Sequence, residues 1–406
     1  MDINVFTLPF SMRKLLVSLI VIVALLETAK VSAQETITGQ DVKANPITTA
    51  VPFLTIAPDS RHGAMGDAGV ATSPDVNAQH WNASQYAFME SSFGIGVSYT
   101  PWLRDLADDI NLAYVAGYYR LDNLQTVSAS LRYFSLGSIQ LTDAQGQPMG
   151  SQNPNEFAFD AGYSRKLSDN WSGAVVLRYI RSDLSGGVGD ETYSPGNAFA
   201  TDVSFYYHTA WKDSRQRREI SAGIDISNVG SKISYDQGET KEFLPANLRL
   251  GTAFSMDLDE YNSLTLTADI NKLLVPTPAD TVSATDSGNG TIIVTPGYGS
   301  DKSVISAVFS SFGDAPGGFK EELQEVMVSL GAEYWYNKQF ALRAGYFYEN
   351  QNKGNRKYFT AGAGLKMNVF ALDFSYLLPT ERNNPLQNTL RFTLSFDLDA
   401  FQKTQR

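Results

Sequence analysis

The sequence predicts an all-β protein, a closed transmembrane up-and-down β-barrel of about 14 antiparallel strands. Three observations lead to this fold class. From about residue 93 onward, successive segments alternate apolar with small or polar residues, which is typical of strands with two different faces. The breaks between these segments are alternately short and long. No run approaches the roughly 18 apolar residues of a membrane-spanning helix. A sheet in lipid must close, because an open edge would leave backbone groups unpaired.

Residues 1–33 have the pattern of a signal peptide. Arg13 and Lys14 supply positive charge, residues 15–26 form an apolar stretch, and the small residues Val-Ser-Ala precede Gln34. Cleavage there would leave a mature chain that begins at Gln34. A helical membrane anchor fits less well, because the apolar stretch holds about 12 residues and a span needs about 20.

The start of translation stays open between Met1 and Met12, since the basic pair and the apolar stretch follow either one. Removal of the leader changes the net charge from −11 to −12. An acidic protein is a poor candidate for nucleic-acid binding, because Lys and Arg supply most of the affinity for phosphates. The absence of cysteine excludes disulfides and thiolate chemistry.

Residues 356–367 show the strand pattern most clearly. Every odd position from Phe359 to Met367 is apolar, and the even positions between them are Thr, Gly or Lys. The same period of two, with any charges on the polar side, recurs along the chain. We expect strands near 93–100, 112–121, 124–135, 155–166, 171–183, 198–211, 217–229, 245–257, 260–272, 324–336, 339–349, 356–367, 370–378 and 388–398.

The connections between these segments also indicate an up-and-down barrel. Periplasmic turns and extracellular loops produce a strict alternation of short and long connections in outer-membrane barrels. Trp171, Trp211 and Trp335 at the turn ends of strands, and Trp102 at a loop end, suit interfacial aromatic girdles. The tight turns fall at 122–123, 168–170, 212–216, 257–260, 337–338 and 368–369, and the longer linkers at 101–111, 136–154, 184–197, 230–244, 273–323, 350–355 and 379–387.

The polar faces of the expected strands carry charges of both signs. A channel for polar solutes would have such a lining, and so would a closed lumen in which ion pairs fill the space or hold a plug. We favour the ion pairs, because the signs are balanced. The luminal charges are Arg132, Asp160, Arg178, Asp202, Asp225, Arg249, Asp269, Glu333, Arg343, Lys366, Asp373 and Arg391.

Residues 34–92 do not alternate. They contain four prolines and the glycine-rich run 63–69. A segment of about 60 residues upstream of a barrel must lie below it or inside it, and glycines permit close backbone packing against a wall. We expect this segment to enter the lumen as a plug. His62 and His80 are expected to be hydrogen-bonding residues, since no spacing typical of a metal site or a catalytic base accompanies them. No metal or cofactor is expected. The expected organisation is a leader at 1–33, a plug at 34–92, a barrel at 93–398 with its largest loop at 273–323, and a tail at 399–406.

Two stretches of the expected plug resemble a known family. Pro52–Arg61 and Gly63–Ala71 look like the N-terminal signature of the PorV family of the type IX secretion system. From Gly66 to Ser84 the sequence is also similar to the broader FadL-like family of fatty-acid transporter barrels, although the Asn-Pro-Ala-like element of that family is only partly matched. The FadL similarity concerns the fold alone. The residues that carry the signature are Pro52, Phe53, Pro58, Asp59, Arg61, Gly63, Met65, Gly66, Asp67, Gly69 and Asn82.

The resemblance to the PorV family implies a function. Members are 14-stranded FadL-type barrels in the Gram-negative outer membrane, with their loops outside the cell and outer-membrane lipid around them. They receive secreted cargo at the type IX translocon by its C-terminal signal domain. They then pass it to a sortase-containing attachment complex, which cleaves the signal. The barrel itself is expected to be a carrier, not an enzyme.

The linker 273–323 is the largest candidate for a partner-binding loop. Residues 303–312 are expected to form a short helix opened by Asp301, with Gly313 and the Pro-Gly-Gly sequence after it as the stop. An apolar stripe on this helix can dock a partner or fold down over the barrel mouth, and the sequence leaves both open. The stripe consists of Val304, Val308, Phe309 and Phe312.

Two other functions remain as alternatives. A FadL-type channel for hydrophobic solutes would need an apolar lumen, whereas most of the luminal positions are charged or small. An outer-membrane lipid hydrolase would need a Ser–His–acid set. His208 is the only histidine on an expected strand, and Ser204 lies about 13 Å away along that strand, beyond hydrogen-bond reach.

Overall fold

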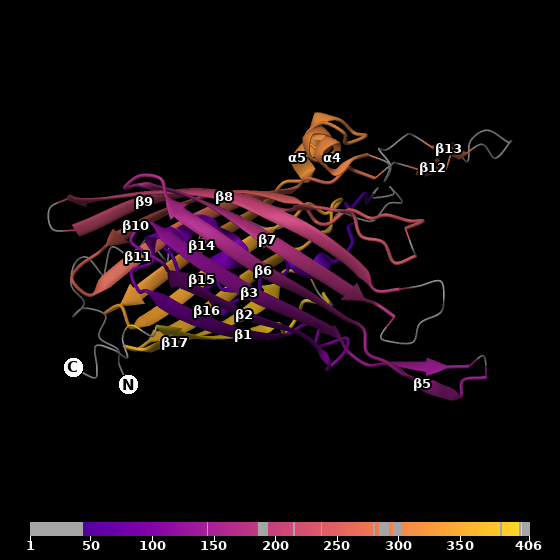
Figure 1. Ribbon diagram of the computed structural model, residues 1–406, viewed down its shortest axis with the longest axis horizontal. Helices are drawn as coiled ribbons and strands as arrows, with labels where there is room; N and C mark the ends of the chain where they lie inside the picture. Colours follow the sequence, from indigo (N-terminus) through magenta and orange to yellow (C-terminus); the bar gives the residue numbers. More distant parts are fainter. Residues whose placement is uncertain are drawn as a thin grey trace, which may run out of the picture. The chain divides into compact units, whose positions relative to one another are not determined.

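The computed structural model describes residues 44–399, apart from 144, 186–193, 214–215, 237, 279–280, 284–291, 295–301, 382–383 and 398. The expected signal peptide, and the expected tail apart from Asp399, lie outside the described residues. Fourteen antiparallel strands form a closed ring in the order β1-β18-β17-β16-β15-β14-β11-β10-β9-β8-β7-β6-β3-β2 (Figure 1). The predicted closed barrel of about 14 strands is confirmed.

Each barrel strand lies within about three residues of its predicted bounds, because alternation marks both faces along most of its length. The strands are β1 (Phe93–Pro101), β2 (Ile110–Arg120), β3 (Gln125–Leu136), β6 (Asn155–Lys166), β7 (Trp171–Asp183), β8 (Gly196–Asp213), β9 (Gln216–Gly230), β10 (Asn247–Asp257), β11 (Asn262–Leu273), β14 (Met327–Tyr336), β15 (Phe340–Tyr348), β16 (Lys357–Lys366), β17 (Phe370–Pro379) and β18 (Leu390–Asp397).

Short and long connections alternate around the ring, as predicted. Connections such as 121–124 and 337–339 define what we call the short-turn end of the barrel. Linkers such as 274–326 and 349–356 define the opposite, long-loop end. Strand β1 starts at the short-turn end, because its first residue, Phe93, pairs with Tyr119 beside the turn into β3.

Two hairpins inside the long connections were not predicted. One pairs β4 (Ile139–Thr142) with β5 (Pro148–Gln152), and the other pairs β12 (Thr281–Ser283) with β13 (Ile292–Val294). Nearly all residues of β4 and β5 are exposed. The hairpin therefore buries neither face, and no apolar alternation marks it in the sequence.

The barrel wall has an apolar exterior and a polar interior. On the outer face, Leu177, Phe199 and Leu342 are 63–67% exposed. Trp171 and Trp211 also face outward, as expected for girdle residues. Trp335 differs from that expectation, because it lines an internal cavity and lies 5.4 Å below the guanidinium of Arg343. Among the described residues, no helix is both long and apolar enough to cross a membrane.

The N-terminal segment 44–92 is packed against the inner faces of the strands (Figure 1, indigo). At the long-loop end, the backbone N–H of Asn45 donates to the carbonyl of Asn352 at 2.8 Å. At the short-turn end, the segment leads directly into β1. Residues 44–92 therefore cross the interior once before the first strand. Its short helices are η2 (Pro52–Thr55), α2 (Ser60–Gly63), α3 (Ala78–Trp81) and η3 (Ala83–Phe88).

Two apolar clusters join this segment to the wall. Near the long-loop end, Phe53 and Leu54 of η2 pack with Phe134 and Ile180. Further along, Tyr86 of η3 packs with Tyr118, Val176 and their neighbours. These clusters hold the two halves of the segment and leave the polar run between them to contact the charged wall.

Candidate functional site

The signature residue Asp59 organises the centre of the N-terminal segment. Its carboxylate caps α2 by accepting from the backbone N–H of His62 at 3.0 Å. The same oxygen lies 2.9 Å from Nδ1 of His62, and the other accepts from Nε1 of Trp81 at 2.7 Å. Nε2 of His62 contacts the hydroxyl of Thr72 at 3.0 Å. His62 is therefore fully engaged in hydrogen bonds, and its two ring nitrogens already have partners.

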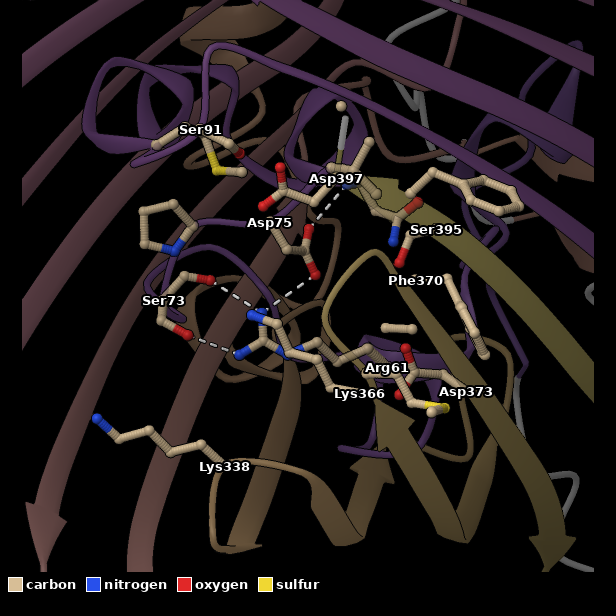
Figure 2. Close-up of a pocket in the computed structure, with 18 of the residues that line it drawn as sticks. Arg61, Ser73, Asp75, Ser91, Lys338, Lys366, Phe370, Asp373, Ser395 and Asp397 are labelled. Atoms are coloured by element: carbon tan, nitrogen blue, oxygen red, sulfur yellow. Dashed lines mark hydrogen bonds and ion pairs between the residues drawn. The ribbon is translucent and has the colours of Figure 1, made fainter. Parts of the chain in front are cut away.

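The signature residue Arg61 joins the segment to the barrel wall. Its guanidinium forms two hydrogen bonds with Glu333 of β14, at 2.9 and 3.0 Å. It also contacts Ser73 and Asp75, both in its own segment (Figure 2). Glu333 in turn accepts from Arg343 of β15 at 2.7 Å. This geometry is typical of a structural ion-pair network with few free hydrogen-bonding groups.

The glycine-rich run passes very close to the wall. Gly66 has a φ of +69°, and a Cβ placed there would lie 2.6 Å from the carbonyl oxygen of Tyr346. The N–H groups of Gly69 and Val70 both donate to one carboxylate oxygen of Asp269, at 2.7 and 3.0 Å. Asn82 donates to the carbonyl of Phe205 on β8 at 3.0 Å. Residues 66–82 of the N-terminal segment are thus in contact with strands that are far apart in the ring.

The remaining signature residues divide between the wall and the cavities. Phe53 stacks on Phe134, with ring centroids 6.1 Å apart. Pro58, Gly63 and Met65 are buried. Pro52 is exposed and lines the cavity described below at the long-loop end, as does Asp67, which accepts from the hydroxyl of Tyr358 at 2.6 Å.

Most of the luminal charges are paired. Arg178 bridges Asp160 and Asp202 on neighbouring strands, at 2.6 and 2.9 Å. Arg343 bridges Glu333 and Asp373 in the same way. These pairs support the ion-pair interpretation of the balanced charges over a solute channel. Arg132 and Arg249 differ, because neither has a carboxylate within ion-pair distance in the part of the chain that the structure describes.

The candidate partner-binding loop contains two helices, α4 (Val304–Ser310) and α5 (Phe319–Gln324). The hydroxyl of Ser303 caps α4, so the expected opening residue, Asp301, is not the cap, and that position lies outside the described residues. Val308 packs against the apolar cluster formed by Ala246, Leu274 and Val275, and Val304 is half-buried. Phe309 and Phe312 are 76% and 53% exposed.

The sequence pattern missed α5 and three members of the exposed surface. Residue 324 was expected to begin a strand, but it ends a six-residue helix, and the strand starts at Met327. Such a helix is too short to show a period. We call Ile305, Phe309, Phe312, Phe319 and Leu323 the apolar loop patch, and all are 53–78% exposed.

Two lysines hold α5 on the barrel rim. Lys272 of β11 contacts Glu322 at 3.0 Å and Glu325 at 2.5 Å. Lys353 contacts Glu321 at 2.6 Å and Glu325 at 3.0 Å. Burial opposes ionisation of Glu321, but the hydrogen bond and charge of Lys353, together with hydrogen bonds from the N–H of Gly317 and the side chain of Asn45, outweigh it, so the pKa of Glu321 lies below its ordinary value.

In the described part of the chain, cavities lie at both ends of the interior. The turn-end cavity, of about 340 Å³, is lined by charged groups that include Arg61, Asp75, Lys338, Lys366 and Asp397 (Figure 2). The loop-end cavity, of about 450 Å³, lies between the N-terminal segment and the linker 349–356. Its wall combines apolar, amide and charged groups.

The residues of the hydrolase alternative do not form a catalytic set in the described chain. Nδ1 of His208 lies 3.5 Å from a carboxylate oxygen of Glu219, and its ring packs edge-on to Phe88. The hydroxyl of Ser204 accepts from the N–H of Ser84, and no hydrogen bond joins Ser204 to His208. In the same described ranges, no group of three or more His, Cys, Asp or Glu residues is placed to hold a metal ion.

Comparison with known protein families shows to which family this barrel belongs. The family described as "Type IX secretion system protein PorV" matches residues 39–280, which is more than half of the chain. The chain belongs to the PorV family. It is therefore an outer-membrane component of the type IX secretion system. The matched region includes every signature residue and strands β1 to β11.

Several solved barrels have similar chain paths at low sequence identity. The toluene transporter TodX of Pseudomonas putida has a TM-score of 0.47 and 11% identity, covering 84% of this chain and 98% of its own. The toluene transporter TbuX of Ralstonia pickettii has a TM-score of 0.42 and 11% identity, covering 83% and 96%. A FadL homologue of Pseudomonas aeruginosa has a TM-score of 0.40 and 12% identity, covering 87% and 99%. A search of curated protein sequences gives no significant match.

Proposed function

We propose that this PorV-family protein is a shuttle for secreted proteins. It binds the C-terminal signal domain of cargo at the type IX translocon and delivers the cargo to the sortase-containing attachment complex. The observation that carries the proposal is the family match over residues 39–280. The interior, packed by the N-terminal segment, supports a carrier over an open pore. In this proposal the barrel cleaves no bond and needs no cofactor.

The proposal assigns an orientation and a role to the N-terminal segment. The long-loop end faces the outside of the cell, because short turns face the periplasm in barrels of this kind. Residues 34–92 act as a plug that keeps the membrane sealed while cargo is exchanged. Its attachment by Arg61 to Glu333 and by Gly69 to Asp269 supports this role.

The apolar loop patch is the proposed docking surface for a protein partner. Phe309 and Phe319 are more exposed than any apolar residue on the lipid-facing wall. Large exposed aromatic side chains on a loop are costly in water and are typical of an interaction site. Val308, on another side of α4, packs down against the rim. The helix therefore covers the rim and presents its outer aromatic residues at the same time.

Deletion of the gene tests the proposal. Surface-attached cargo should be lost, and cargo with an uncleaved signal domain should accumulate in the cell or in the medium. Immunoblots of cell fractions and surface labelling of intact cells measure both effects. A plasmid copy of the gene should restore display, which controls for effects on neighbouring genes. Normal surface display in the deletion strain would contradict the proposal.

A further inference from the structure

The loop-end cavity has the size of a ligand site. Its volume of about 450 Å³ lies within the range of pockets that enclose small molecules or chain ends. The N-terminal segment contributes Ile47 and Trp81 to its wall, and strand β15 contributes Phe347. Lys353 and its neighbours in the linker 349–356 line the rim at the long-loop end.

Arg249 of β10 brings a buried positive charge to this wall. The residue is 6% exposed, its Nη1 donates to the carbonyl of His80 at 2.7 Å, and its guanidinium lies 5.4 Å from the ring of Trp81. Asp225, its cross-strand neighbour on β9, and Asp202 and Asp269 interact with it electrostatically. In the described part of the chain, however, no carboxylate lies within ion-pair distance of it, whereas Arg178 and Arg343 are each held by two. A buried cation without a direct ion pair is costly, and an anionic ligand in contact with it would reduce that cost.

A second donor lies beside this guanidinium. Asn271 of β11 is the cross-strand partner of Arg249, is 9% exposed, and lines the same cavity. Within the described residues its side chain has no hydrogen bond. Asn247, in the orientation that satisfies both of its atoms, accepts from Nε of Arg249 at 3.1 Å. Nη2 of Arg249 and the side-chain amide of Asn271 thus have no hydrogen-bond partner within the described residues, and they belong to paired residues that line one cavity, so they can donate to the two oxygens of a carboxylate.

The other charges on the wall are already neutralised. Lys353 is held by two glutamates of the loop that carries α5. Arg356 forms two hydrogen bonds with Glu349, both at 2.8 Å. Asp67 accepts from Tyr358 and lies 3.6 Å from Arg391. Arg249 is therefore the cation of this wall that is available to an anion.

We propose that the loop-end cavity binds the free carboxyl end of a polypeptide, with the carboxylate on Arg249 and Asn271. This inference rests on the proposed function, in which cargo is held at its C-terminal domain. Leu273, Met327 and Phe347 would receive the apolar side chains of the chain end. An alkyl chain in the same place would remove the polar groups of the wall from water without forming hydrogen bonds to them. A peptide backbone can form such hydrogen bonds, so the cavity suits a peptide better.

Peptide retention by the purified full-length barrel in detergent tests the inference. The probes are N-terminally biotinylated peptides with four randomised C-terminal residues, prepared as free acids and as amides, together with dodecanoate. The free-acid pool should be retained about tenfold more than the amide pool, because one charge-assisted carboxylate contact is lost in the amide. Arg249→Met should abolish this difference, and Lys338→Met, which removes a positive charge at the turn-end cavity, should leave it intact.

Folding of each variant is checked by its heat-dependent gel mobility, and Asn271→Leu gives a second, uncharged disruption of the same donor pair. Equal retention of acids and amides by the unmodified barrel would overturn the inference. So would tighter binding of dodecanoate than of the free-acid peptides, since the cavity would then be a lipid site.

Surface display of cargo distinguishes the failure of this inference from the failure of the proposed function. Display that is normal in the Arg249→Met strain and absent in the deletion strain would overturn the cavity assignment and leave the shuttle intact.

Discussion

At the scale of single residues, this barrel buries charges and exposes apolar side chains. Arg391 is 1% exposed and Leu177 is 66% exposed. The inward position of each charge could be predicted from sequence, because alternation alone decides which face a strand residue takes. The ion-pair partner of each charge could not be predicted. Arg61 and Glu333 are separated by 272 positions, and nothing local in the sequence relates them.

Gly66 offers a test of close packing between the N-terminal segment and the wall. Gly66→Ala should destabilise the barrel by about 2–4 kcal/mol, because it combines a left-handed backbone with a clash against Tyr346. Urea unfolding in detergent micelles measures the change in the free energy of unfolding.

Gly146 provides the matched control for that substitution. It also has a positive φ, of +77°, but a Cβ there would meet nothing within 4 Å. Gly146→Ala should cost about 1 kcal/mol, the backbone contribution alone. Equal effects at the two positions would show that Gly66 is not in tight contact with β15.

At the scale of elements, the alternation pattern predicted all fourteen barrel strands but neither α5 nor the hairpins of the long connections. The strands are long and two-faced, so the pattern repeats many times in each. Helix α5 has six residues and follows Gly318 with a φ of +68°. Its stability comes from Lys272 and Lys353, which are remote in sequence.

The attachment of α5 should depend on pH. Because the pKa of Glu321 in the folded protein is lowered, its contribution is present above the ordinary value of 4.5 and is lost as the pH falls through the lower, folded value. Hydrogen exchange of the α5 amides, corrected for intrinsic rates, should therefore show protection at about pH 6 that declines toward about pH 3. Lys353→Met should lack this protection at pH 6. Protection that stays constant over this range would contradict the role of the ion pair.

The apolar loop patch can be tested separately from the barrel. Phe309→Ser combined with Phe319→Ser should reduce co-purification with the translocon and surface display of cargo by about tenfold, because exposed aromatic anchors carry much of the binding energy of an interface. Leu106→Ser, which changes a residue that is 67% exposed on another long connection, is the control and should have little effect. Full activity of the double variant would place the docking surface elsewhere.

At the scale of the whole molecule, ring closure and the alternation of connections followed from the sequence. Closure was predictable because an open edge is not tolerated in lipid, and strand number followed from counting segments. The cavities were not predictable. They depend on where the N-terminal segment leaves space, and that segment has no periodicity from which its path could be derived.

The absence of cysteine makes the orientation of the barrel directly testable. Met149 of β5 is 70% exposed at the long-loop end. The thiol of a Met149→Cys variant should therefore react with a membrane-impermeant maleimide on intact cells. Leu167 is 61% exposed in a short turn, and the thiol of a Leu167→Cys variant should react only after the cells are broken. The reverse result would invert the barrel in the membrane.

The path of the N-terminal segment also has a consequence for biogenesis. The described part of the segment starts beside Asn352 and ends at the opposite end of the barrel, where β1 begins. At the seam between β1 and β18, the hydroxyl of Thr393 contacts that of Ser98 and accepts from the N–H of Ser60. A finished cylinder could be threaded from end to end only with difficulty. During insertion, the N-terminal segment must therefore pack against the growing sheet before β1 and β18 pair and close the barrel around it.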